Sequence, residues 1–250
     1  MTRVRCTPQA ACSAVLAAGT DPQELNPVYR ALTDDAPATT PVLSDTDLDL
    51  LRRQVTAPAV LAIAVLIQGR TRRMRIALHR EGAGVESEDG QSWSPHRPEE
   101  LPSLIAALVP SDSPLGAAPR VTQQSAGAGL GLNGQQASAL WARIRDGEAP
   151  QEAVRHLPGL APALRDALLA NGDRASASLT LHVARSAEVD RPVSFGRLWS
   201  VGESGLYRTD TDAPPGGSVV PVEPGDVLGT VLALLEEGLR FAAQDAGAVR

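Results

Sequence analysis

The sequence predicts an α+β protein in which one helix–four-strand–helix unit occurs twice. Residues 44–110 and 159–239 show the same order of expected elements. The segment from Gly90 to Leu101 aligns without a gap on that from Gly216 to Val227, with the glycine, the serine and both prolines coinciding. Two such units are economically packed around a pseudo-two-fold axis, as an antiparallel sheet with flanking helices.

The expected strands of the first unit differ in their patterns. The first strand, over 59–68, is apolar on both faces, which predicts a central place in the sheet. The second strand, over 73–80, alternates apolar residues with arginines and His79, so we expect the polar side chains to face solvent. Ser44 precedes the first helix and is its expected N-cap.

The second unit repeats these patterns with longer loops. Leu179 repeats Ile63 at an offset of 116 residues, and Trp199 repeats Leu78 at an offset of 121. The pair Gly205-Leu206 is set over Gly84-Val85. Insertions confined to turns keep the strand faces in phase, as a duplicated fold requires.

The remaining segments complete a single domain over 1–250. We expect a helical lead over 1–43, a linker and helices over 111–158, and a short tail over 240–250. The stretch from Ser111 to Gly134 is rich in small and polar residues, so two separate domains joined by it are the alternative.

Composition excludes several classes of function. The 250 residues carry a formal net charge of −6, and no basic face or tail indicates nucleic-acid binding. The longest apolar run, residues 57–67, is too short to insert in a membrane, and no export signal is expected, so the predicted location is cytoplasmic. Cys6 and Cys12, near an N-terminus expected to be mobile, are predicted to be unpaired thiols in a reducing compartment.

Motifs that imitate catalytic sites lack the context their chemistry needs. Residues 129–134 match a dinucleotide-binding glycine pattern, but no strand is expected before them, so a flexible linker is favoured. Residues 202–205 imitate a nucleophile elbow but join two expected strands, which indicates a hairpin turn. The histidines show no metal spacing, and Asp210-Thr-Asp212 has the composition of a turn. We therefore expect no catalytic set, no metal and no cofactor.

One charge cluster stands out, around the expected turn between the first two strands. Its members are arginines: Arg70, Arg72, Arg73, Arg75 and Arg80. A solvated strand face is the simpler interpretation. The functional interpretation is a patch that recognises an acidic or polar surface on a partner protein.

The second unit also carries a resemblance to a known family. Trp199 with Gly205-Leu-Tyr207, the valine strand 219–222, Pro224 and the terminal leucine helix resemble the EspG proteins, the ESX (type VII) secretion-associated chaperones of actinobacteria. Val201 and Leu206 stand where the family has Asp and Arg.

The resemblance implies a cytoplasmic, non-enzymatic chaperone or adaptor. Family members bind the apolar tip of a helical secretion substrate, typically a PE–PPE heterodimer, and a WXG100-type pair is a further possible partner. The implied contact residues here are those of the first turn and the strand after it: Gly69, Arg70, Thr71, Arg72, Arg73 and Arg75. A second contact region falls loosely on the helices over 135–171.

Two other functions remain open from the sequence. One is a small-molecule-binding or hydrolytic α+β enzyme that uses His182, Asp210 or Asp212, which would have to converge in a pocket. The other is a homo-oligomeric structural protein that uses the exposed side of its sheet.

Overall fold

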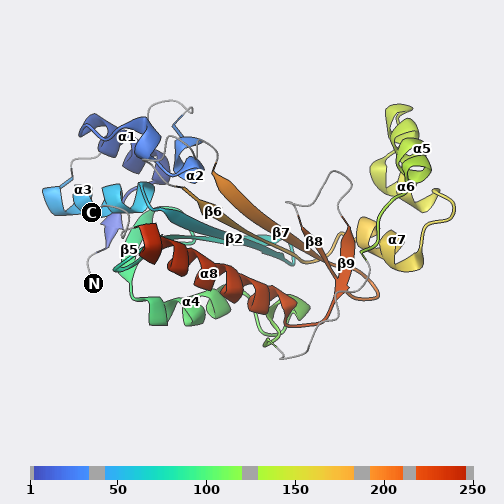
Figure 1. Cartoon of the computed structure of the whole chain (residues 1–250). Helices are drawn as coiled ribbons and strands as arrows, with labels where there is room; N and C mark the ends of the chain where they lie inside the picture. The colour runs from blue at the N-terminus through green and yellow to red at the C-terminus, as the bar shows by residue number, and fades with distance from the viewer. Residues whose placement is uncertain (1–2, 34–42, 120–128, 183–191, 211–217, 246–250) are drawn as a thin grey trace.

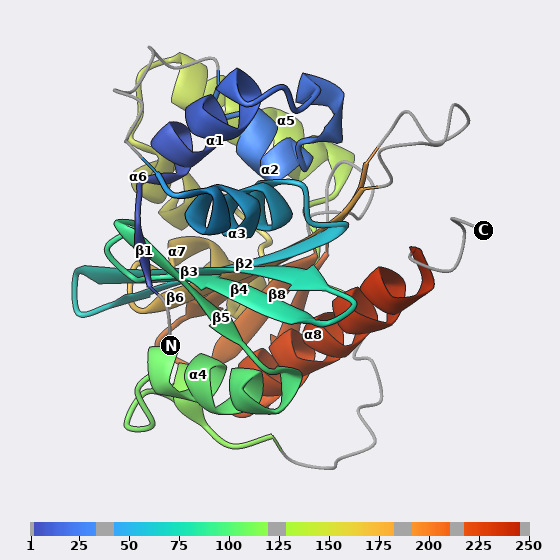
Figure 2. The same cartoon turned by 90° about the vertical axis from the view of Figure 1, so that its left-hand side faces the viewer.

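The described residues form one antiparallel sheet with helices on both faces (Figures 1 and 2). The computed structural model describes residues 3–33, 43–119, 129–182, 192–210 and 218–245. The strands are β1 (Val4–Arg5), β2 (Ala59–Ile67), β3 (Arg70–His79), β4 (Gly82–Glu86), β5 (Ser92–His96), β6 (Arg174–Leu181), β7 (Val193–Val201), β8 (Leu206–Asp210) and β9 (Val219–Val222). The helices are α1 (Pro8–Ala17), α2 (Pro27–Arg30), α3 (Asp45–Val55), α4 (Leu101–Leu108), α5 (Gly134–Arg145), α6 (Pro150–Arg155), α7 (Pro162–Leu169) and α8 (Asp226–Asp245), with short 3₁₀ turns η1 (Pro22–Glu24), η2 (Pro98–Glu100) and η3 (Pro114–Gly116).

Strand β2 lies at the middle of the sheet. The strand order is β1-β5-β4-β3-β2-β6-β7-β8-β9, so two four-strand meanders meet where β2 pairs with β6. This confirms both the α+β antiparallel fold and the central place predicted for the first strand. Ala62 pairs with Ser178, two residues that differ by the predicted offset of 116, so a two-fold axis relating the units would pass through this pair. The origin of the units by duplication stays a prediction.

The β3–β4 and β7–β8 hairpins differ in their turns, which corrects one predicted match. Gly84 lies inside β4 and pairs with Ala77, whereas Gly205 lies in the turn before β8. The first turn holds residues 80–81 and the second holds residues 202–205, because Val201 pairs directly with Leu206. Setting Gly205 over Gly84 was therefore wrong by four residues. Gly216, where the gap-free alignment with the segment from Gly90 to Leu101 begins, lies outside the described residues.

Helices α4 and α8 cover one face of the sheet and bury the main core (Figure 1). Alternate side chains of β2, β3, β6 and β7 point to these helices, including the fully buried Trp199. Helix α8 packs across the junction of the two meanders, and a Cβ atom on Gly238 would come within 2.5 Å of Leu78 and 3.0 Å of Leu179. Glycine at this position therefore allows the close approach of the helix to the sheet.

Helices α1, α2 and α3 cover the opposite face at the β1–β5 end (Figure 2). Ser44 caps α3, as predicted, by accepting the backbone N–H of Asp47. Cys6 and Cys12 are buried in this second core, so the expectation that they lie in a mobile N-terminus was wrong, although both thiols are free as predicted. Burial raises the pKa of Cys6 to about 11 and that of Cys12 to about 12, so both stay protonated.

This covering also changes the exposure of β3. Ala77 and His79 lie on the face that the alternation predicted to be solvated, yet Ala77 is fully buried under α3 and His79 is half-buried. The prediction that this face is solvated therefore holds only in part for His79. Strand β1, which pairs with β5 at the sheet edge, was missed because two residues carry no readable alternation.

Helices α5, α6 and α7 pack on the same face at the other end of the sheet (Figure 1). Their core includes Leu164 of α7 with Tyr207 and Val219 of β8 and β9. Between the two groups of helices the face is lined by small, half-buried residues such as Ala62 and Ala64. The second face of β2 is thus only partly covered, in contrast to the two buried faces expected from its sequence.

Candidate partner-binding site

The turn between β2 and β3 is a two-residue hairpin at one end of these central strands. Ile67 pairs with Arg70, and the two residues between them, Gln68 and Gly69, have φ angles of 49° and 77°. Two successive positive φ angles match the twist of the flanking strands, and glycine adopts this conformation without strain. Strand β3 therefore begins at Arg70, three residues earlier than predicted, so Arg70 and Arg72 lie on the strand rather than in the loop before it, while Arg80 lies in the β3–β4 turn.

Strand alternation divides the six predicted contact residues between the two faces of the sheet. Arg70 and Arg72 lie on the face that carries α4, whereas Thr71, Arg73 and Arg75 lie on the opposite face. Arg70, Thr71 and Arg73 are exposed, as is Gly69 in the turn. The predicted cluster is therefore not one continuous basic patch.

Arg72 is fully engaged within the protein. Its guanidinium donates to Glu88 at 2.6 Å and to the backbone carbonyls of Ala107 and Leu108 at 3.0 and 2.9 Å. These carbonyls belong to the last turn of α4, where a cation complements the helix dipole. The hydrogen bond to Glu88 raises the pKa of Arg72. Arg72 thus holds α4 to the β2–β3 hairpin.

Arg75 is engaged as well, in an ion pair with Glu86 at 2.8 Å. The Glu86 side chain is only 4% exposed, and burial raises its pKa although Arg75 acts in the opposite direction. The pair lies on the open part of the sheet between the two groups of helices. Of the predicted contact residues, Gly69, Arg70, Thr71 and Arg73 remain available to a partner.

The helices of the second predicted contact region lie toward the same end of the strands as the β2–β3 turn. The backbone N–H of Gln68 donates to Asp173 Oδ1 at 3.0 Å, which joins the β2–β3 turn to the segment that follows α7. Asp173 Oδ2 also accepts from Ser113 at 3.4 Å. The bond from Gln68 joins the turn to a residue more than a hundred positions along the chain, just after the predicted second region, which ends at residue 171.

Helix α5 presents apolar surface at this end. None of its twelve residues is buried, and Trp141 is 64% exposed. Leu168 of α7 is also exposed. An exposed tryptophan on a helix that is only lightly packed is typical of a surface that a partner covers. Sequence periodicity grouped Trp141 with Leu140 and Ile144 but did not show that it would remain exposed.

Asp166 of α7 fixes the neighbouring β7–β8 turn. Its carboxylate accepts the N–H groups of Glu203 and Ser204 at 2.8 and 2.9 Å and the Tyr207 hydroxyl at 2.7 Å. Burial by itself would raise the pKa of Asp166, but these hydrogen bonds outweigh it and lower the pKa. A cleft of about 570 Å³ lies between this turn and α6 and α7. Residues 202–205 thus form the hairpin turn that was predicted.

The residues of the enzymatic alternative do not form one site in the described structure. His182 follows β6 and donates from Nε2 to the Gln23 carbonyl at 3.0 Å, while Asp210 lies two strands away and pairs with Arg197 and Arg208. Asp212 lies outside the described residues. Within the described ranges, no three His, Cys, Asp or Glu side chains gather as metal ligands would, and no helix is long and apolar enough to cross a membrane.

Comparison with known proteins gives a likeness in structure but none in sequence. No protein-family model matches the chain, and no curated protein matches it. Among solved structures, the chain is similar to the type VII secretion system chaperone EspG5 of Mycobacterium tuberculosis, solved in complex with a PE25–PPE41 dimer. The likeness covers 94% of this chain and 96% of that chain, with a TM-score of 0.49 and 11% sequence identity. At this identity few side chains are shared, so no residue role transfers between the two proteins.

Proposed function

We propose that this protein is a non-enzymatic, cytoplasmic chaperone or adaptor of type VII (ESX) secretion. It binds the apolar tip of a helical heterodimer, of the PE–PPE or WXG100 kind, and keeps it dispersed until export. The resemblance of the Trp199–Tyr207 segment to the EspG proteins supports this proposal. The scattered positions of His182 and Asp210 give no comparable support to an enzyme.

The observation that carries the proposed contact surface is the exposed Trp141. It lies on α5, within the second region that the resemblance implicates, and the β2–β3 turn is the first such region. The apolar tip of a helical pair would cover Trp141 and Leu168, removing apolar area from water at roughly 25 cal/mol per Å². Arg70 and Arg73, which are exposed on opposite faces of the sheet near the β2–β3 turn, would meet polar groups of the partner.

Co-expression with a panel of PE–PPE and WXG100-type heterodimers tests the function. We expect at least one heterodimer, insoluble when expressed by itself, to co-purify with this protein as a stoichiometric complex. If every heterodimer in the panel stays insoluble and unbound, the proposed function is wrong.

Paired substitutions test the surface. Trp141→Glu should weaken binding of that heterodimer by about thirtyfold, as loss of a central aromatic contact does. Val193→Glu is the matched control, because Val193 is also exposed, at 46%, but begins β7 at the opposite end of the sheet. Calorimetry on both variants, checked for folding by circular dichroism, gives the comparison. Equal affinities for the two variants would show that Trp141 is not part of the contact surface. The proposed function would be unaffected by that result.

A further inference from the structure

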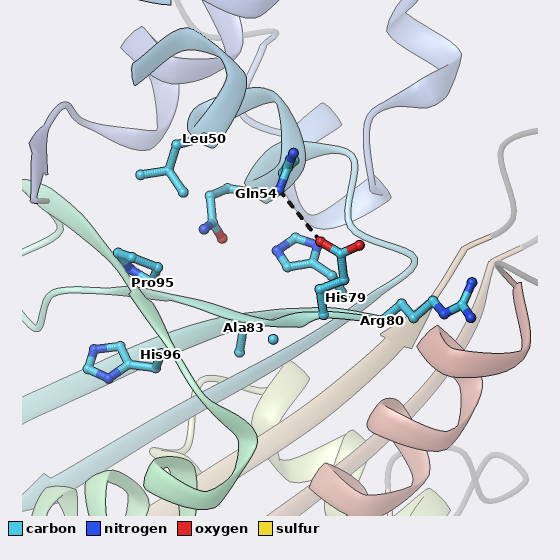
Figure 3. A pocket seen from close by; sticks show the side chains of 10 residues that line it. Leu50, Gln54, His79, Arg80, Ala83, Pro95 and His96 are labelled. Carbon is cyan, nitrogen blue, oxygen red and sulfur yellow. Dashed lines mark ion pairs between the residues drawn. The ribbon is translucent and has the colours of Figure 1, made fainter. Parts of the chain in front are cut away.

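A second cavity lies at the opposite end of β3 from the proposed partner surface. It has a volume of about 520 Å³, within the range of small-molecule sites, and opens between α3, the β3–β4 turn and β5 (Figure 3). Its lining includes apolar side chains from three elements, Leu50, Ala83 and Pro95, together with the polar residues Gln54 and His79. Of these residues, only His79 was considered from the sequence, as one of the histidines that show no metal spacing.

Gln54 is the unusual residue of this cavity. It is 1% exposed, and its amide oxygen has no hydrogen-bond partner among the described residues. Figure 3 shows the side chain descending from α3 toward the strands, beside the ring of His79. A buried amide oxygen without a partner costs stability, so such a group requires an explanation.

Gly84 makes room for this amide. A Cβ atom at Gly84 would come within 1.6 Å of both terminal atoms of Gln54. Any residue other than glycine at position 84 would therefore displace the Gln54 side chain. The backbone of β4 therefore forms the floor on which the amide lies, with its orientation fixed by packing rather than by hydrogen bonds. This is the arrangement of a binding group held ready for a ligand.

Neither Gln54 nor His79 carries a charge at neutral pH. Burial, with a smaller contribution from Arg53, lowers the pKa of His79 to about 4, so its ring is neutral and offers one donor and one acceptor. Three charged residues also line the cavity: Arg53 and Glu81, which form an exposed ion pair at 4.0 Å, and Arg80. An ionised ligand group placed against Gln54 and the neutral His79 ring would lose its hydration without gaining a counter-charge from these two residues.

We propose that this cavity binds a small, neutral molecule that presents an amide-like edge to Gln54 and an apolar body to Leu50, Ala83 and Pro95. An amide edge supplies the donor that the Gln54 oxygen lacks and an acceptor beside it. The two uncharged residues at this position, Gln54 and His79, select against the corresponding carboxylate. Because the β3–β4 and β2–β3 turns lie at opposite ends of β3, the site is independent of the proposed partner surface.

Benzamide is a suitable probe, with benzoate as its charged counterpart of nearly equal shape. Titration of the full chain, followed by NMR of the protein amides, should show saturable benzamide binding with shifts confined to residues around the cavity, such as Gln54 and Ala83. Benzoate should bind at least about tenfold more weakly, since an unpaired buried charge costs more than this ratio requires. Equal binding of the two probes, or no binding of either, would overturn the proposal.

Two variants distinguish a ligand-binding role of Gln54 from a purely structural one. Gln54→Met keeps the side-chain length but removes the amide, and we expect benzamide affinity to fall about tenfold while the melting temperature stays equal or rises. Leu50→Trp fills the cavity from α3, leaves Gln54 in place, and should also abolish binding. A lowered melting temperature for Gln54→Met without any probe would mean that the amide is already satisfied, by water for example, and would refute the proposal.

Discussion

At the scale of single residues, similar side chains in one arginine cluster have different tasks. Arg72 reaches Glu88 and the end of α4, and Arg75 pairs with the buried Glu86, whereas Arg70 and Arg73 are exposed. Alternation along β3 explains the division between the two faces of the sheet. Which of the arginines are engaged depends on residues 11 to 36 positions further along the chain, which the pattern of the strand does not contain.

We predict that Arg72→Ala lowers the free energy of unfolding by about 1–2 kcal/mol. The change removes charge-assisted bonds to two carbonyls of α4 and the ion pair with Glu88, whose partial exposure limits its contribution. Urea unfolding at pH 7 measures the effect. Arg70→Ala, two residues earlier and exposed, is the control and should change the free energy by no more than about 0.5 kcal/mol. Equal effects of the two changes would contradict the capping role of Arg72.

At the scale of elements, two hairpin turns at the same end of the strands are held in different ways. The two-residue β2–β3 turn follows from Gly69 and its positive φ angle. The longer β7–β8 turn depends on Asp166 of a different element, which binds two of its N–H groups. Sequence reasoning identified both turns but misplaced the second relative to its counterpart, because turn length alone does not fix strand register.

We predict that Asp166→Ala destabilises the protein by about 2–3 kcal/mol at pH 7, because three hydrogen bonds to one carboxylate are lost. Tyr207→Phe removes only one of them and should cost about 1 kcal/mol. The lowered pKa of Asp166 means that its stabilising contribution is present at neutral pH and disappears as the pH falls through that pKa. The difference between Asp166→Ala and the natural protein should therefore shrink in acid.

Glu203→Ala is the control for this experiment. Glu203 is exposed in the same turn, and its backbone N–H still reaches Asp166 after the change. Chemical unfolding of all three variants between pH 7 and pH 3 gives the comparison. A cost for Asp166→Ala no larger than that for Glu203→Ala would show that the turn does not depend on the carboxylate.

At the scale of the whole molecule, the two meanders form one continuous sheet. Eight residue pairs join β2 to β6, and α8 of the second half packs on β2 and β3 of the first half as well as on β6. Each half therefore supplies the other with a strand partner and with part of its apolar cover. Two independent domains would leave β2 and β6 as long, apolar edges.

We predict that residues 1–119 and residues 129–250, expressed as separate chains, do not fold independently. Each would expose the β2 or β6 edge and the apolar face beneath α8, so each should aggregate or remain unfolded. Expressed together, they should form a one-to-one complex with the secondary structure of the natural chain. Size-exclusion chromatography and circular dichroism test this expectation. A fragment that is monomeric and unfolds cooperatively by itself would show that the halves are separate domains.

The sequence by itself determined the types and order of most elements. A run apolar on both faces marked β2, alternation of period two marked β3, and Ser44 marked the start of α3. The strand order of the two meanders follows from consecutive hairpins. These features are local, since they depend on backbone geometry and on residues a few positions apart. They were sufficient to predict an α+β antiparallel fold with a central first strand.

Only the tertiary structure decided which surfaces remain available. Burial of Cys12 in the core of α1–α3, burial of Ala77 under α3, engagement of Arg72 and exposure of Trp141 all depend on elements distant in the sequence. The same is true of the cavity at Gln54, whose floor is a glycine thirty residues later in the chain. Burial is a property of the packed chain, because it depends on what lies above a residue. Periodicity shows only which residues share a face.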